Sequence, residues 1–278
     1  MTNKIKIGFS PCPNDCFIFD AMVHHKIDTY GLDFEPMMLD VEALNQKAFQ
    51  NELDVTKLSF HAFLYAQKNY ILLKSGSALG FNCGPLLVQS SEFEVGTLQN
   101  KKIAIPGKYT TANFLLSLAF PEAKNKIEML FSDIEQAVLD GKADVGLIIH
   151  EGRFTYEKKG LKQIIDLGEY WESLIHAPIP LGGIVAKRSL DADLIRKVDD
   201  CIRRSVEFAF KNPESSMNYV RQHAQEMEQD VMKKHIALYV NEFSIDLGET
   251  GAKAVNLLFN KAKENGLIDT ITEPLILN

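Results

Sequence analysis

The alternation of apolar and polar residues follows the same course twice along this chain. Alternating apolar residues at positions 5, 7 and 9 predict a strand, followed by a turn containing two prolines and an apolar helix over residues 17–23. The order returns where residues 103 and 105 alternate, residues 106–111 form a turn, and residues 112–120 predict a helix. Each half then continues through a strand, a helix and a further strand. We therefore expect two similar α/β lobes.

Two pairs of aspartates occupy matching places in these halves. Asp40 and Asp133 each precede a helical pattern, where a side-chain oxygen accepts hydrogen bonds from the first free amides of the helix. Asp54 and Asp144 each come directly before the next apolar strand. We expect the first pair to cap helices and the second pair to mark the starts of strands.

The C-terminal part differs because its pattern is helical. Residues 177–190 predict a strand that returns to the first lobe, and helices are then expected from the apolar stripe that follows, from Pro213, over residues 230–240 and over residues 248–264. The stripe consists of Ile195, Val198, Ile202, Val206 and Ala209. We assign residues 1–88 and 186–278 to the first lobe and residues 89–185 to the second, with the C-terminal helices acting as scaffold.

Strands that alternate with helices predict parallel sheets with helices on both faces. In such sheets ligands bind beyond the carboxyl ends of the strands, which points to four loops: residues 10–15, 59–61, 106–111 and 150–153. If the lobes face each other, these loops meet in one cleft. We then expect the lobes to close over a substrate, a motion that small-angle scattering would detect.

Composition restricts the classes of partner. The chain has 278 residues, 46% of them apolar, and a formal charge of -7 without long runs of one sign, so we expect no nucleic-acid partner. It shows neither a membrane-spanning stretch nor the apolar core of a signal peptide, so we expect a cytoplasmic protein with no membrane partner. The four cysteines form no paired motif and are expected to be free thiols. Oligomeric state is not indicated.

His150 is the leading catalytic candidate. It follows the apolar run of residues 145–149 and stands two residues before Gly152, so the imidazole is expected in a loop after a buried strand. Imidazole has a reference pKa of about 6.5 and is well matched to proton abstraction at neutral pH. A structural, hydrogen-bonded histidine is the competing interpretation. His61 has the matching place in the first half, and both roles stay open for it.

Several hydroxyl and amide side chains are candidate ligand contacts. Thr110 and Thr111 lead into a helix whose first amides suit a carboxylate or phosphate. The equally weighted alternative is that one of these threonines simply caps the helix, and a third is that one caps while the other binds. Asn14 and Asp15 either cap a helix, the favoured interpretation, or bind a ligand hydroxyl. Ser59 and Ser77 fall near the expected cleft but lack the surroundings of a nucleophile. No grouping of residues has the spacing of a metal site or of a nucleotide loop, so neither a metal nor a nucleotide cofactor is expected.

Specific motifs carry a family resemblance over about residues 5–185. The strings "SPCPNDCFIFDAMV", "DVTKLSFHAF", "GSALGFNCGPLLV", "IPGKYTTANFLLSL", "IIHEGRFTYEKKGL" and "PIPLGG" closely resemble those of the 1,4-dihydroxy-6-naphthoate synthases of the futalosine route to menaquinone, which have the periplasmic binding protein type II fold. One departure is Cys16, where the family motif is expected to carry threonine.

The resemblance implies a cofactor-independent lyase that converts cyclic dehypoxanthinyl futalosine to 1,4-dihydroxy-6-naphthoate and dihydroxyacetone. It implies that His150 removes a proton beside the substrate ketone, and that substrate contacts come from Lys57, Leu58 and Ser59 and from the two threonines. The alternatives are a chorismate dehydratase-like enzyme of the same fold, against which the string "HEGRFTY" argues, and a cytoplasmic solute-binding module without catalysis.

Overall fold

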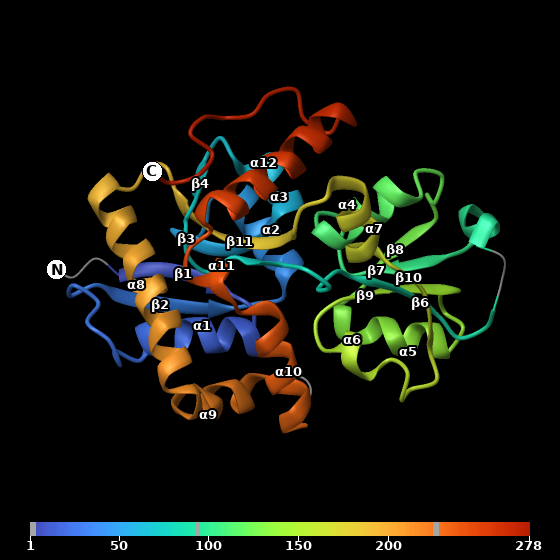
Figure 1. Ribbon diagram of the computed structural model, residues 1–278, viewed down its shortest axis with the longest axis horizontal. Coiled ribbons are helices and arrows are strands. Elements are labelled where there is room, and N and C mark those ends of the chain that lie inside the picture. Colours follow the sequence, from blue (N-terminus) through green and yellow to red (C-terminus); the bar gives the residue numbers. More distant parts are fainter. Residues whose placement is uncertain (1–3, 93–94, 225–227) are drawn as a thin grey trace. The chain divides into compact units, whose positions relative to one another are not determined.

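A computed structural model describes residues 4–92, 95–224 and 228–278, which fold as two compact units (Figure 1). The first unit comprises Met1–Gly80 and Pro180–Asn278, and the second comprises Phe81–Ile179. The chain leaves the first unit before β6 (Leu86–Gln89) and returns to it at β11 (Ile179–Lys187), because β6 pairs within the second sheet and β11 within the first. Both unit boundaries therefore fall earlier in the chain than residues 88 and 185, where the sequence placed them.

The first unit is built on a sheet with the strand order β2-β1-β3-β11-β4, with β5 paired to β11. Strand β1 is parallel to β2 and to β3, whereas β11 is antiparallel to β3 and β4. Because Gly8 in β1 is in register with Thr56 in β3, these two strands end at the same edge. The remaining strands have the following bounds: β1 (Lys4–Phe9), β2 (Asp33–Met38), β3 (Val55–Ser59), β4 (Tyr70–Leu72) and β5 (Ala78–Gly80).

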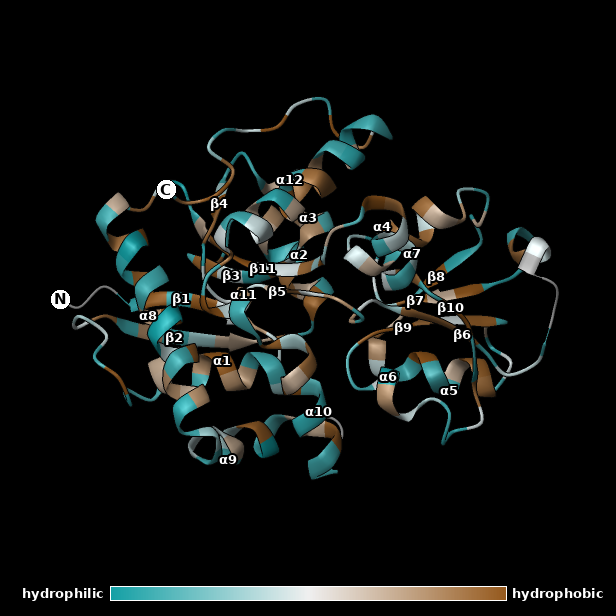
Figure 2. Cartoon of the chain, in the orientation of Figure 1, coloured by the Kyte–Doolittle hydropathy of each residue, from teal (hydrophilic) through white to brown (hydrophobic). Residues whose placement is uncertain are grey.

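Helices cover this sheet, and α1 packs against α8, α9 and α10. In Figure 2 strand β11 is largely hydrophobic, whereas α8 and α10 carry hydrophilic as well as hydrophobic residues. All five residues of the predicted α8 stripe are buried, which confirms that helix. The helices of this unit have these bounds: α1 (Pro13–Val23), α2 (Val41–Phe49), α3 (Phe60–Ala66), α8 (Ala192–Lys211), α9 (Pro213–His223), α10 (Gln229–Tyr239), α11 (Glu242–Ile245) and α12 (Gly248–Glu264).

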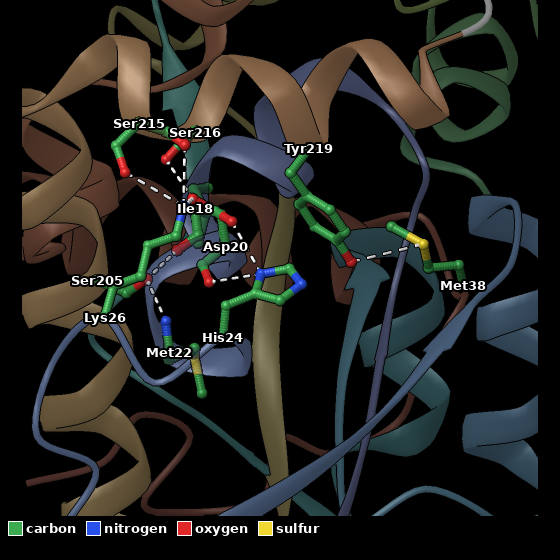
Figure 3. Close-up of polar contacts among 10 residues, drawn as sticks. All are labelled: Ile18, Asp20, Met22, His24, Lys26, Met38, Ser205, Ser215, Ser216 and Tyr219. Atoms are coloured by element: carbon green, nitrogen blue, oxygen red, sulfur yellow. Dashed lines mark hydrogen bonds and ion pairs between the residues drawn. The ribbon is translucent and has the colours of Figure 1, made fainter.

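Buried polar contacts attach the C-terminal helices to α1 (Figure 3). The carboxylate of Asp20, 1% exposed, accepts hydrogen bonds from Lys26 Nζ at 2.5 Å and from Ser216 Oγ of α9 at 2.8 Å. Ser205 of α8 donates its hydroxyl to the carbonyl of Ile18 at 2.6 Å and accepts from the Met22 amide at 3.2 Å. The position of α1 is thus fixed by groups from far along the chain.

The second unit has a sheet with the order β10-β6-β9-β7-β8. Strand β7 is parallel to β8 and β9, whereas β6 is antiparallel to β9 and β10. The strands are β7 (Ile103–Ile105), β8 (Lys126–Glu128), β9 (Val145–Ile148) and β10 (Lys162–Asp166), and the helices are α4 (Thr111–Ala119), α5 (Ile134–Leu139), α6 (Gly152–Thr155) and α7 (Leu167–Ile175), with 3₁₀ turns η1 (Val95–Asn100) and η2 (Phe131–Asp133).

The internal repeat is confirmed, because β1-α1-β2-α2-β3 in the first unit is matched by β7-α4-β8-α5-β9 in the second. The repeat strands pair in parallel, as predicted, but β11 and β6 are antiparallel to their neighbours β3 and β9. Strands β6 and β11 each follow a crossing of the chain between units rather than a helical crossover, and an antiparallel strand needs no such crossover.

The matched aspartates show which individual hydrogen bonds the two halves of the repeat share. Asp54 accepts from the Lys6 amide at 3.0 Å, and Asp144 accepts from the Lys102 amide at 2.7 Å, so each ties the start of a central strand to its neighbour. Asp40 caps α2 as predicted, accepting from two amides of its first turn. The predicted cap at Asp133 is wrong, because η2 leads into α5 and leaves Asp133 with helical backbone angles and no side-chain cap.

None of the four cysteines forms a disulfide, as the sequence predicted, and all four are buried. Burial raises the pKa of Cys83 to about 12 and that of Cys201 to about 11, so both stay protonated near neutral pH. We expect the native protein to resist alkylation by iodoacetamide at pH 8, and all four thiols to react in guanidinium chloride. Mass spectrometry would count the labels, with an added exposed thiol, Ser91→Cys, as the control. Native labelling of any original cysteine at the rate of the control thiol would contradict this expectation.

No helix within the described residues is long and apolar enough to cross a membrane.

Candidate active site

In each unit, two of the four predicted loops lie at the same edge of a sheet. In the first unit, the turn of residues 10–15 follows β1, and β3 runs directly into α3 at Ser59. In the second, the turn of residues 106–111 follows β7 and the segment of His150 follows β9, its parallel neighbour. The sheet registers therefore bring together the loops that the sequence selected within each unit.

A buried carboxylate organises the edge of the first unit. Asp15 is 1% exposed; its Oδ2 accepts from the amide and the hydroxyl of Ser10, at 3.0 and 2.8 Å. Its Oδ1 accepts from Asn14 Nδ2 and from Lys57 Nζ, both at 2.9 Å. We call Ser10, Asn14, Asp15 and Lys57 the Asp15 network. The carboxylate thus accepts four hydrogen bonds, two on each oxygen, from the other three residues of the network.

The favoured interpretation of Asn14 and Asp15 as helix caps is wrong. The N-cap residue of α1 is Cys12, which makes no side-chain capping bond. Asp15 stands in the first turn of α1, and its side chain reaches back to the Ser10 amide, which lies before the helix. The carboxylate therefore fixes the turn after β1 instead of satisfying the helix.

Lys57 supplies the positive charge of the network. Its side chain is 6% exposed, and Nζ donates to Asp15 Oδ1 and to the carbonyl of Gly76 at 3.2 Å. An ammonium group has three donors, and these contacts engage two of them. Lys57 is thus held rigidly at the middle of β3, with one N–H that makes no further bond among the described residues.

The other candidates of the first unit have distinct surroundings. The Ser59 amide donates to Asn45 Oδ1 at 3.0 Å, which attaches the end of β3 to α2. Leu58 is fully buried and alternates with Lys57, so its side chain faces the opposite side of the sheet. Ser77 follows Gly76 and is fully buried, and its Oγ has no hydrogen bond within the described residues. His61 lies in the first turn of α3, with its ring centroid 5.6 Å from that of Tyr65.

In the second unit, the threonine turn forms as predicted. Thr110 is the N-cap of α4; its Oγ1 accepts from the Asn113 amide at 3.2 Å and donates to the carbonyl of Gly107 at 2.8 Å. Thr111 is the first residue of α4 and is 3% exposed. The amides of this first turn carry the partial positive charge of the helix and suit an anion.

Lys126 stabilises the threonine turn from the neighbouring strand β8. Its Nζ donates to Asn113 Oδ1 at 2.8 Å, while Asn113 Nδ2 donates to the carbonyl of Lys108 at 2.8 Å. Burial lowers the pKa of Lys126 to about 8. Asn113 therefore bonds the turn at Lys108 through its side chain and at Thr110 through its backbone amide, and Lys126 holds that side chain in place.

His150 is half-buried and has a left-handed backbone conformation, with φ of 57°. This conformation is uncommon for residues other than glycine, although asparagine, aspartate and histidine adopt it more often than the other residues do. Its ring lies edge-on to Phe131 of η2, with centroids 4.8 Å apart. The left-handed turn carries the chain from β9 into α6 and sets the imidazole at the carboxyl end of the strand.

Arg153 holds the short helix that follows His150. Its guanidinium donates to the carbonyl of Gly84 and to Asp166 Oδ2, both at 2.6 Å, while Asp166 Oδ1 accepts from the Gly168 amide at 2.7 Å. Gly84 and Gly168 approach so closely that a Cβ on Gly84 would lie 2.2 Å from the Gly168 nitrogen. The segment of His150 is thereby fixed to the turn before α7 and to the chain before β6.

We expect Arg153→Ala to lower kcat roughly tenfold, because a loosened α6 displaces the imidazole, and a displacement of about 1 Å can cost about 10²-fold. The control is Lys162→Ala, which removes an exposed ion pair with Glu92 of a kind worth about 0–1 kcal/mol. Steady-state kinetics and thermal unfolding of both variants would check this. Equal kcat values for the two variants would show that Arg153 does not position the histidine.

Sequence reasoning missed two buried residues that complete the first-unit edge. Asn45 fixes Ser59, and His235 of α10 bonds Asn14 through Nε2 at 2.9 Å. His235 lies on the apolar stripe of its helix with Val231 and Tyr239, and a fully buried histidine in that stripe is the signal that could have singled it out.

The fold is that of the periplasmic binding proteins. The alkanesulfonate-binding protein of Xanthomonas axonopodis pv. citri superposes with a TM-score of 0.73 at 15% identity, covering 98% of this chain and 97% of its own. The zinc-bound ligand-binding component of an ABC-type import system from Staphylococcus aureus superposes with a TM-score of 0.71, also at 15% identity, covering 99% and 96% of the two chains.

Closer relatives define the family. A family described as menaquinone biosynthesis matches residues 5–264. Two relatives are 1,4-dihydroxy-6-naphthoate synthases: that of Thermus thermophilus is 43% identical over 98% of this chain and 99% of its own length, and that of Streptomyces coelicolor is 41% identical over 97% and 96%. A crystal structure from Archaeoglobus fulgidus has a TM-score of 0.90 at 38% identity, covering 95% and 98%. The chain belongs to the menaquinone biosynthesis family and is an enzyme acting on a small molecule.

Proposed function

We propose that this enzyme is a 1,4-dihydroxy-6-naphthoate synthase, a carbon-carbon lyase that acts on cyclic dehypoxanthinyl futalosine. The products are 1,4-dihydroxy-6-naphthoate and dihydroxyacetone. The observation that carries the proposal is the identity of 43% and 41%, over nearly the whole chain, with two enzymes of that name. The location that follows from a biosynthetic role of this kind is the cytoplasm.

We assign the proton abstraction to His150. The histidine stands at the carboxyl end of a parallel strand, half-buried against an aromatic ring, in a turn that Arg153 holds in place. Such a site can supply an imidazole in a fixed direction, which general-base catalysis requires. In the proposed reaction, the base removes a proton beside the substrate ketone. Ring opening and carbon-carbon cleavage follow, and formation of the aromatic ring drives the reaction.

We assign substrate binding to both sheet edges. The first turn of α4 at Thr110 and Thr111 suits the substrate carboxylate, because helix N-terminal amides bind anions. Lys57 and Ser59 are proposed to contact the polar part of the substrate, and Lys57 has an N–H left for an oxygen. The steps are acid-base steps without net oxidation, so the proposal invokes no cofactor.

A direct test is incubation of the purified enzyme with cyclic dehypoxanthinyl futalosine and, separately, with chorismate, followed by chromatography and mass spectrometry. We expect naphthoate from the first and no change in the second. Loss of water from chorismate without naphthoate formation would replace the proposal with a chorismate dehydratase-like activity. Binding of either compound without turnover would replace it with a solute-binding module.

A further inference from the structure

We propose that His235 is a positioning residue of this enzyme, which acts through Asn14 on the Asp15–Lys57 pair. The inference rests on the proposed function, because that function assigns Lys57 to the substrate. His235 comes from α10, in the C-terminal part of the chain that the sequence indicated to be scaffold.

Three consecutive hydrogen bonds connect His235 to Lys57. His235 Nε2 lies 2.9 Å from Asn14 Oδ1, Asn14 Nδ2 lies 2.9 Å from Asp15 Oδ1, and that oxygen lies 2.9 Å from Lys57 Nζ. His235 is fully buried, and Asn14 and Asp15 are 5% and 1% exposed. Water therefore has little access to replace any link of this series, and each link depends on its neighbours.

The chemistry of the series fixes the direction of each donation. Both oxygens of Asp15 act as acceptors, Oδ1 from the Lys57 ammonium group and Oδ2 from the amide and hydroxyl of Ser10. The Asn14 atom that faces Asp15 must be the NH₂ group, and the carbonyl oxygen of Asn14 then faces His235. His235 Nε2 must therefore carry the proton.

Packing holds the histidine ring in place. Helix α10 packs against α1 and β5, and the His235 ring lies 4.7 Å, between centroids, from that of Tyr239 one turn further along the helix. Without the Nε2 donor, the Asn14 amide loses the contact that sets its rotation. The bond from Asn14 to Asp15 Oδ1 then weakens, and Lys57 Nζ shifts toward the carboxylate and away from the substrate.

The test compares His235→Phe, which fills the space without a donor, with His235→Gln, whose side-chain NH₂ can replace Nε2–H. We expect the phenylalanine variant to lower kcat/KM about 10- to 100-fold, the range for a small misplacement of a catalytic-site group. The glutamine variant should recover to within about threefold of wild type. Lys234→Gln, at the exposed neighbouring position of α10, is the control and should leave kcat/KM unchanged.

A double-mutant cycle tests the route through Asn14. If His235 acts through Asn14, then Asn14→Ala combined with His235→Phe should be no worse in kcat/KM than Asn14→Ala alone, and the unfolding free energies should also be non-additive. Additive losses, or a glutamine variant no better than the phenylalanine variant, would overturn the proposal. Since the unfolding cycle needs no substrate, it judges the His235–Asn14 coupling even if the wild type forms no naphthoate, a result that would reject the proposed function alone.

Discussion

His150→Ala is expected to lower kcat by at least about 100-fold while the enzyme still binds its substrate. General-base catalysis contributes about 10²- to 10⁴-fold, and removing a group that acts only in the transition state lowers kcat without raising Kd. Stopped-flow or steady-state formation of the naphthoate, together with calorimetric binding, would measure the two quantities separately.

The backbone at position 150 calls for a second variant and a matched control. Because φ is positive there, alanine adds backbone strain, whereas asparagine accepts this conformation and has no basic nitrogen. His150→Asn should therefore unfold at nearly the wild-type temperature and be as inactive as His150→Ala. His176→Ala replaces an exposed histidine with the same left-handed conformation, φ 55°, and should keep full activity. Retained turnover in His150→Asn would return His150 to a structural role.

Lys57→Met should produce the largest loss of stability among the variants considered. The substitution leaves the Asp15 carboxylate buried without its counter-charge, and breaking such a pair costs about 3–5 kcal/mol. Denaturant unfolding followed by circular dichroism would measure this loss. Turnover should fall as well, because Lys57 is assigned to the substrate.

Two comparisons show whether the loss comes from the unpaired charge. Adding Asp15→Asn to Lys57→Met removes the negative charge and should restore part of the unfolding free energy. Lys47→Met breaks an ion pair whose side chains are 29% and 43% exposed, so it should change the unfolding free energy by less than about 1 kcal/mol. A loss for Lys57→Met as small as that for Lys47→Met would show that the pair does not stabilise the fold.

The repeat made much of the fold predictable from sequence. Local signals were sufficient where an aspartate bonds backbone amides at the start of an element. Asp40 caps its helix, and Asp54 and Asp144 precede the central strands of their units. The signal failed at Asp133, because a 3₁₀ turn before α5 depends on packing rather than on the aspartate itself. The directions of β6 and β11 also depended on where the chain crosses between units, which local patterns do not encode.

Only those features of the candidate site that depend on a single segment of the chain could be predicted. The turns after the parallel strands could be selected because topology places ligands there, and Thr110 caps α4 as expected. The roles of Asp15 and Asn14 could not be predicted, because their partners are distant in the sequence. Lys57 lies 42 residues from Asp15, and His235 lies 221 residues from Asn14. Hydrogen bonds over such separations follow from tertiary packing, and no local spacing indicates them.

The measurement that tests the central claim most directly is the product balance of the wild-type enzyme with cyclic dehypoxanthinyl futalosine. The relative from Thermus thermophilus, 43% identical, serves as the positive control. We predict that 1,4-dihydroxy-6-naphthoate and dihydroxyacetone form in equal amounts, each matching the substrate consumed. Unchanged substrate under conditions in which the control enzyme is active, or consumption of substrate without naphthoate, would contradict the assignment.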